Sequence, residues 1–186
     1  MRWDDLFGDL EAQADALEVA ERAAEVGERV RIEVGALGMR DRLRAAVGAP
    51  VRLEVAGALR LHGELSRVGA DWMLLDESAG RESLVPLAAV GTVSGLGRLS
   101  TVPGTEGPVL ARLSLRSALR GLARDRSTVR MHLVDGTVRD ATLDRVGSDF
   151  VEVALHPAGE ARRRSEVRDI QLVPFSAIAA VRRGAG

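Results

Sequence analysis

The spacing of apolar residues at the start of the chain predicts a long amphipathic α-helix within residues 1–37. These residues step by alternate threes and fours, which places them along one face of a helix. They are Trp3, Leu6, Leu10, Leu17, Ala20 and Ala24. Most acidic residues of the segment lie off this face.

The large side chains of this face cover about two heptads, fewer than the three or four that a sustained coiled coil needs. Two interpretations therefore stay open. The helix packs on its own domain or on one partner helix, or it forms a homo-oligomer through Trp3, Leu6, Leu10 and Leu17.

Beyond Gly38 the pattern changes to the alternation of apolar and polar residues that is typical of half-buried strands. A short helix is expected at residues 39–47, because Gly48-Ala49-Pro50 follows. Val51, Leu53 and Val55 then alternate with polar residues. Turn residues separate four further short apolar runs before residue 96. Residues 38–96 are therefore predicted to form one helix and five strands.

The same order returns after a linker at residues 97–108, which is rich in Gly and Pro. A helix is expected from about residue 109 to 124. Leu143–Phe150 then matches Leu65–Trp72 at an offset of 78, and Leu172–Ile178 matches Leu84–Val90 at an offset of 88. Such an ordered series of matches indicates an internal duplication. A second repeat is predicted at residues 109–183.

A helix followed by five short strands resembles the order of elements in Sm-like proteins. Val129–Gly136, followed by Leu143 and Val146–Phe150, is similar to their first sequence motif. Gly63 stands where that family bends its second strand, since glycine tolerates close backbone approach at a corner. SH3-like and PRC-type small barrels are similar as well, and the two Leu-Val-Pro sequences favour the PRC type.

The resemblance implies a mainly β protein with helices (α+β). We expect two tandem small bent β-barrels, each preceded by a helix, behind the long N-terminal helix. The predicted segments are the acidic helix at 1–37, the first barrel at 38–96, the linker at 97–108 and the second barrel at 109–183.

The functional part of the Sm-like pattern is missing. Those proteins hold a nucleobase with an Asn after the second turn and an Arg-Gly pair between the last strands. The aligned positions carry Met73 and Val151, and the last strands contain no Arg-Gly pair. We therefore expect no uridine pocket. Sm-like barrels also assemble through their edge strands, and a fused tandem could satisfy one edge internally.

Composition excludes several classes of site. The chain has no Cys, so it has no disulfide framework, thiolate nucleophile or Cys-based zinc site. It also lacks Lys, Asn and Tyr, a pattern typical of GC-rich coding in a high-GC bacterium. His62, His132 and His156 occupy expected polar sides of strands and do not recur at equivalent repeat positions. No catalytic motif is present, so we expect no enzyme activity, metal or cofactor.

Charge is distributed unevenly, with an acidic segment before Gly38 and a basic excess after residue 97. Within the basic part, an arginine recurs at every fourth position of the helix expected at 109–124, which aligns these side chains on one face. We call Arg112, Arg116, Arg120 and Arg124 the arginine stripe. Arg126 and Arg162, Arg163 and Arg164 could extend it into a patch that binds nucleic acid or another anion.

Two other interpretations of the stripe remain. Arginine is the only cationic residue type of the chain apart from histidine, so any solvated helix face would show it. The acidic N-terminal segment could also be its partner.

Neither a signal peptide nor a membrane-spanning apolar run is recognisable, so we expect a soluble cytoplasmic protein with no membrane association. The leading hypothesis is a non-catalytic binding or assembly protein that self-associates or binds a protein partner. The alternative is an RNA- or DNA-binding protein that uses the arginine stripe.

Overall fold

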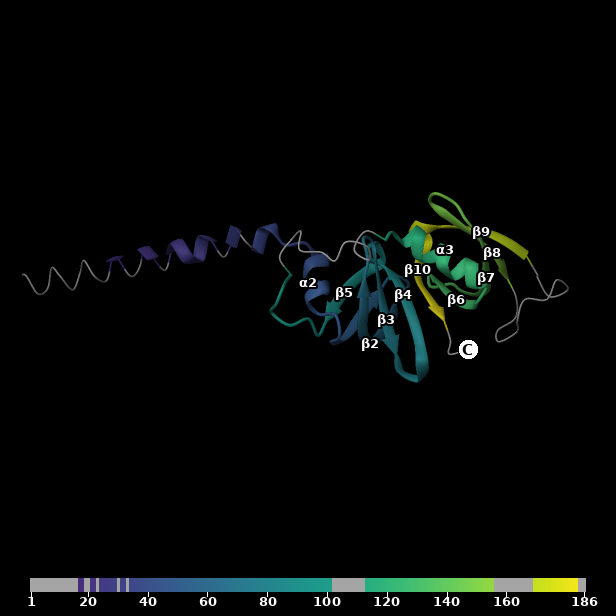
Figure 1. The fold of residues 1–186 in the computed structure, drawn as a ribbon, viewed down its shortest axis with the longest axis horizontal. Coiled ribbons are helices and arrows are strands. Elements are labelled where there is room, and N and C mark those ends of the chain that lie inside the picture. Colours follow the sequence, from purple (N-terminus) through teal and green to yellow (C-terminus); the bar gives the residue numbers. More distant parts are fainter. Residues whose placement is uncertain are drawn as a thin grey trace, which may run out of the picture. The chain divides into compact units, whose positions relative to one another are not determined.

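The computed structural model describes residues 17–18, 21–22, 24–29, 31–32, 34–101, 113–155 and 169–183. The chain divides into two compact units, Met1–Gly38 and Met39–Gly186. In the first unit, the described residues between 17 and 36 have helical backbone. All the strands of the described residues lie in the second unit (Figure 1).

The second unit begins with a short helix and five strands. These are α2 (Met39–Ala45), β1 (Pro50–Val55), β2 (Leu59–Val68), β3 (Trp72–Glu77), β4 (Arg81–Pro86) and β5 (Val90–Ser94). A second series follows with α3 (Leu115–Asp125), β6 (Thr128–Leu133), β7 (Val138–Val146), β8 (Phe150–Leu155), β9 (Asp169–Pro174) and β10 (Ile178–Arg183). We call β1–β5 the first strand set and β6–β10 the second strand set.

The two strand sets have the same internal order and are joined into one sheet. The order of the ten strands is β5-β1-β2-β3-β4-β10-β6-β7-β8-β9, and all neighbours are antiparallel. At the β4–β10 joint, Leu84 lies opposite Val181, Ser83 opposite Arg182 and Glu82 opposite Arg183.

The prediction of two separate barrels is therefore wrong. The finding that overturns it is the hydrogen-bonded β4–β10 joint, which makes the two sets parts of one ten-stranded open sheet. The physical reason is that an edge strand carries unpaired backbone N–H and C=O groups, and pairing β4 with β10 satisfies both sets of groups at once.

The long N-terminal helix of the predicted fold class is also incorrect. The α-helices with defined bounds in the described chain are α2 and α3, of 7 and 11 residues, and no long helix with defined bounds lies among the described residues before Gly38. Several of their side chains are exposed, among them Leu17, Val26 and Ile32. Most helical stability in proteins comes from burying an apolar face, and these exposed side chains contribute no such burial.

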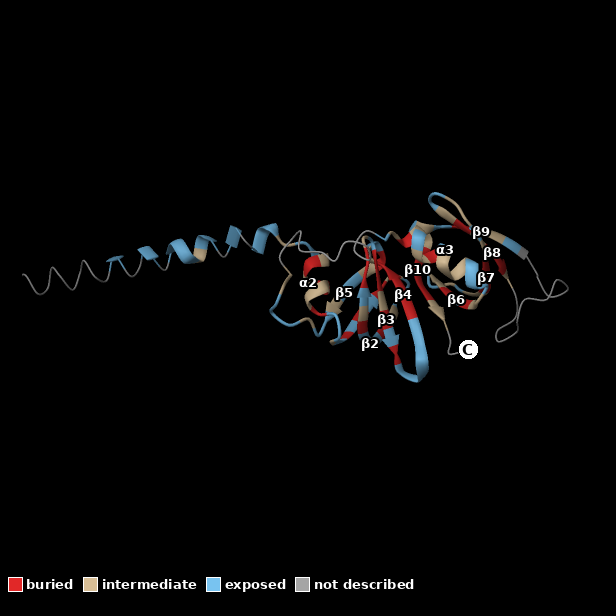
Figure 2. Cartoon of the chain, in the orientation of Figure 1, coloured by how far each residue is buried: buried red, intermediate tan, exposed pale blue. Residues whose placement is uncertain are grey.

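Buried apolar side chains form two clusters, one for each strand set, and each cluster takes residues from the other set (Figure 2). Ala179 and Ala180 of β10 belong to the first cluster. Trp72 and Leu84 of the first set belong to the second. The two sets therefore share apolar packing as well as backbone hydrogen bonds.

The start of α3 is attached to the turn between β2 and β3. The indole Nε1 of Trp72 donates a hydrogen bond to the carbonyl of Leu113 at 2.8 Å. The Asp71 carboxylate accepts a hydrogen bond from the backbone N–H of Leu115 at 2.6 Å. Ser114 caps the helix by accepting from the N–H of Ser117. The helix that precedes the second strand set is thus held by residues of the first.

Candidate functional site

The described part of the arginine stripe lies on α3. Leu115 and Leu119 are buried beneath the helix, and Arg120 and Arg124 are exposed on it. Arg126 follows the helix in the left-handed conformation and is exposed. These three arginines are the exposed part of the stripe among the described residues.

Arg116 differs from the rest of the stripe. It is half-buried, and its Nε is buried without a hydrogen-bond partner in the described part of the chain. Arg112 and Arg162–Arg164 lie outside the described residues, so the extension of the stripe into a larger patch stays a prediction. Among the predicted oligomerisation residues, Leu17 is described and exposed, whereas Trp3, Leu6 and Leu10 lie outside the described residues.

A buried polar cluster lies at the β4–β10 joint. The Arg182 guanidinium donates to both carboxylate oxygens of Glu77, at 2.9 and 3.0 Å. Ser83 donates its hydroxyl to the same carboxylate, and its side chain is fully buried. Because every polar group in this triad has a partner, we interpret it as a structural connection between the strand sets.

His132 lies on the strand next to Arg182. Burial lowers the pKa of His132, and the nearby charges of Arg182 and Arg130 lower it further. Its Nε2 is buried and has no hydrogen-bond partner among the described residues. The imidazole is therefore favoured in its neutral form.

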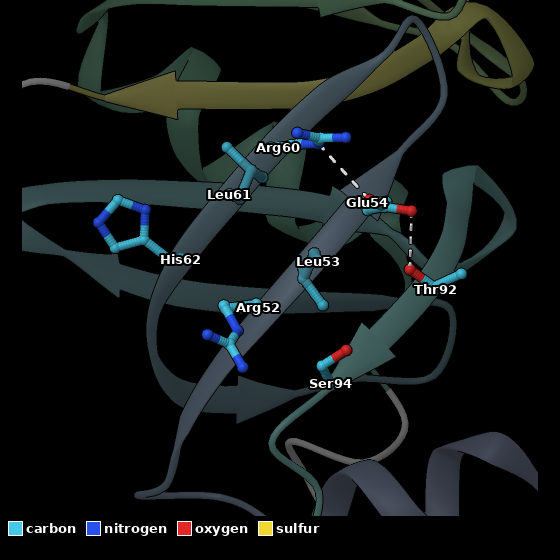
Figure 3. Close-up of a pocket in the computed structure, with 8 residues that line it drawn as sticks. All are labelled: Arg52, Leu53, Glu54, Arg60, Leu61, His62, Thr92 and Ser94. Atoms are coloured by element: carbon cyan, nitrogen blue, oxygen red, sulfur yellow. Dashed lines mark hydrogen bonds and ion pairs between the residues drawn. The ribbon is translucent and has the colours of Figure 1, made fainter.

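A hollow of about 650 Å³ opens on the outer face of β1, β2 and β5 (Figure 3). Buried Leu53 and Leu61 contribute to its lining. Its polar side chains are all exposed, and they are Arg52, Glu54, Arg60, His62, Thr92 and Ser94. Sequence reasoning missed this set, because its members come together only through the register of three strands.

A second groove, of about 330 Å³, lies between α3 and strands β3 and β4. Trp72, Leu84 and Leu122 give it an apolar lining, and Arg67, Glu82 and Asp125 give it charges of both signs. Its mixture of charges selects no particular ligand.

The described part of the chain contains neither a candidate metal cluster nor a candidate membrane-spanning helix. Those residues contain no group of three or more His, Asp or Glu side chains that could hold a metal ion. No helix among them has the length and apolar character to cross a membrane.

No family model matches this sequence, and no curated protein matches it either. The resemblance to Sm-like proteins therefore stays a prediction, and so do the domain boundaries inferred from the repeats.

Proposed function

We propose that this protein is a non-catalytic assembly protein whose copies associate through the two ends of the ten-stranded sheet. The observation that carries the proposal is the β4–β10 joint, where the edge of one strand set pairs with the edge of the other. Within the described sheet, β5 is paired on one side with β1, and β9 on one side with β8. Each end strand thus offers a backbone edge to a further strand.

The internal joint supplies a template for pairing between copies. β9 occupies the same place in the second strand set that β4 occupies in the first, and β5 corresponds to β10 in the same way. If β5 of one copy pairs with β9 of the next in the register of the β4–β10 joint, Val93 lies opposite Leu172 and Ser94 lies opposite Gln171. These are an apolar pair and a pair of polar side chains, the kinds of cross-strand neighbour that stabilise a sheet.

Strand β9 also exposes large apolar side chains. Ile170 is 62% exposed and Leu172 is 58% exposed. Exposed apolar edge strands promote association, and proteins that stay monomeric protect such edges with charges, prolines or covering segments. A second copy is the partner that we infer, because the chain itself carries the complementary edge on β5.

Pairing of β9 with β5 of another copy is head-to-tail. Each added copy leaves the same two edges open, so the assembly closes into a ring or grows as a filament, according to the rotation between copies. Light scattering of the full-length protein tests the proposal. We expect a mass above the 19.8 kDa of one chain and a fall to that mass when Ile170 and Leu172 are both replaced by Lys.

Val138→Lys is the matched control, because Val138 is a 43% exposed valine on β7, a strand paired on both sides. This control should keep the wild-type mass. A single-chain mass for the wild-type protein contradicts the proposal. If the mass falls only when Leu6 and Leu10 are replaced by Arg, the copies associate through the N-terminal segment and not through the ends of the sheet.

A second candidate function is nucleic-acid binding by the exposed part of the arginine stripe. The observation that favours it is that Arg120, Arg124 and Arg126 are exposed and have no carboxylate partner in the described residues. Guanidinium groups in that situation suit phosphates. Phosphate contacts of this kind would bind the backbone without reading its sequence.

A further inference from the structure

We propose that Arg52, His62 and Ser94 form a binding site for the phosphate group of a small molecule, on the outer face of the first strand set. These three residues lie in the hollow of β1, β2 and β5. The proposal is independent of assembly through the sheet ends.

Strand register places the polar residues of the hollow in two rows. In the first, Arg52 is the cross-strand partner of both His62 and Ser94. In the second, Glu54 is the partner of both Arg60 and Thr92. Directly opposite residues in an antiparallel sheet have Cβ atoms about 5 Å apart, so each row is one group of neighbouring side chains. Figure 3 shows Arg52 between His62 and Ser94.

The second row satisfies its own hydrogen bonds. Glu54 accepts from the Thr92 hydroxyl at 3.3 Å and forms an ion pair with Arg60 at 3.5 Å. The first row has no acidic member, and no hydrogen bond or ion pair joins its side chains to other described residues. A guanidinium is a donor only, and a hydroxyl and an imidazole can both donate. The first row therefore lacks a charged acceptor such as a carboxylate.

The second strand set contains that acceptor at the equivalent position. Arg130 corresponds to Arg52, and its cross-strand partner on β7 is Asp140 instead of a histidine. Arg130 donates to the two oxygens of Asp140 at 2.9 and 3.3 Å. That hydrogen bond and the charge of the carboxylate raise the pKa of Arg130. In the second set the arginine is paired with the carboxylate of Asp140, and in the first set His62 occupies the position of that aspartate.

The place of Ser94 also differs between the two strand sets. Its counterpart on β10 is Arg182, which is the partner of Arg130 across the strands and is bound by Glu77. The first set thus differs from the second on both sides of the arginine. The two cross-strand partners of Arg52, His62 and Ser94, carry no carboxylate. An oxyanion would accept from the guanidinium, the imidazole and the hydroxyl together.

A phosphate group fits this arrangement because its oxygens can accept from three donors on three different strands. Arginine binds phosphate through its planar, two-pronged donor geometry. The hollow has about 650 Å³ of space, within the range of small-molecule sites, roughly 300–1,000 Å³.

Equilibrium dialysis of the full-length protein against radiolabelled inorganic phosphate tests the site, with chloride added to hold the ionic strength constant. We expect one saturable site per chain. Arg52→Gln should weaken binding by about tenfold or more, since a hydrogen bond to a charged group is worth about 1.5–3 kcal/mol. His62→Asp should do the same, because it supplies the internal carboxylate found in the second strand set.

Arg130→Gln is the matched control and should bind phosphate as the wild-type protein does. Circular dichroism and a urea titration show whether the variants keep the fold. Non-saturable binding, unchanged binding by His62→Asp, or an equal loss in Arg130→Gln overturns the proposal. Competition with glycerol 3-phosphate distinguishes a phosphorylated small molecule from free phosphate as the ligand. If the site binds the small molecule, glycerol 3-phosphate should displace the labelled phosphate at a lower concentration than unlabelled phosphate does.

Discussion

Arg182 of β10 donates two hydrogen bonds to the carboxylate of Glu77, a residue 105 positions earlier at the end of β3. Both side chains are largely buried, with 5% of Glu77 and 23% of Arg182 exposed. The pair therefore fastens the second strand set to the first beside the β4–β10 joint. A bidentate pair in this environment also fixes the relative position of the two strands.

Replacing Arg182 with Met should lower the free energy of unfolding by about 3–5 kcal/mol, because it leaves the buried Glu77 carboxylate without its partner. Urea denaturation measures the change. The double variant Glu77→Gln with Arg182→Met should recover part of the loss. Arg183→Met is the control, since the ion pair of Arg183 with Asp125 is 3.8 Å long and exposed and should be worth about 1 kcal/mol or less. Equal losses in the two single variants would contradict this reasoning.

The stability of the protein should fall as the pH drops below the ordinary titration range of histidine. Burial and the charges of Arg182 and Arg130 lower the pKa of His132 in the folded chain. The unfolded chain takes up a proton near its usual pKa of about 6.5, before the folded chain does. Stability is therefore full above that pH and declines as the pH falls towards the lowered folded pKa.

The check is the urea midpoint at about pH 7.5 and about pH 5.5, on either side of the unfolded pKa. His132→Gln should show a smaller decrease between the two conditions than the wild-type protein. An identical decrease in both would show that His132 does not contribute.

Gly57→Ala should destabilise the fold, by about 1–3 kcal/mol if the strained conformation is retained. Gly57 has a φ of 75°, and a Cβ there would lie 2.6 Å from the carbonyl oxygen of Leu133 and 3.0 Å from the nitrogen of Gly136. Gly121→Ala on α3 should have the opposite sign, because nothing lies within 4 Å of the added Cβ and alanine favours a helix by about 1 kcal/mol. Thermal unfolding measures the midpoint temperature of each variant. A shift of both midpoints in the same direction would refute the prediction that the two substitutions have opposite effects.

If α3 binds nucleic acid, Arg120→Glu with Arg124→Glu should abolish the binding while the fold remains. In the wild-type protein, each phosphate contact should add about −0.9 to the log–log salt slope for duplex DNA and about −0.7 for a single strand. Fluorescence anisotropy at several salt concentrations measures both effects. Arg145→Glu is the control, because its side chain is 83% exposed and lies on β7 instead of α3. Absence of binding at low salt eliminates this function.

Local pattern was sufficient for most strands of the fold. Val51, Leu53 and Val55 alternate in the sequence and are 2%, 1% and 5% exposed, as a half-buried strand requires. The helix expected near residues 109–124 corresponds to α3, whose described bounds are Leu115–Asp125. These features depend on residues that are close in the chain, and the period at which apolar residues recur indicates a helix or a strand directly.

Pairing between residues far apart in the chain could not be predicted from the sequence. Glu77 lies in a stretch that reads as a polar turn, and nothing near it indicates a partner among the last residues of β10. The hollow of Arg52 and His62 was missed for a similar reason, because only the register of β1, β2 and β5 brings its side chains together. The spacing of the stripe aligns Arg116 with Arg120 and Arg124 on one helix face, but the tertiary packing of α3 half-buries Arg116 and leaves the other two exposed.

The place of β10 in the sheet sets an order for folding. Every other neighbouring pair of strands joins segments within one strand set, but β10 must fill a central gap between β4 and β6. Its Arg182 lies 99 residues after Ser83, so loop closure makes this pairing slow compared with the hairpins on either side. Until β10 arrives, β4 and β6 both present open edges at the middle of the molecule. At high protein concentration during refolding, β10 of one chain can enter the gap of another, and the expected misfolded product is a strand-exchanged dimer.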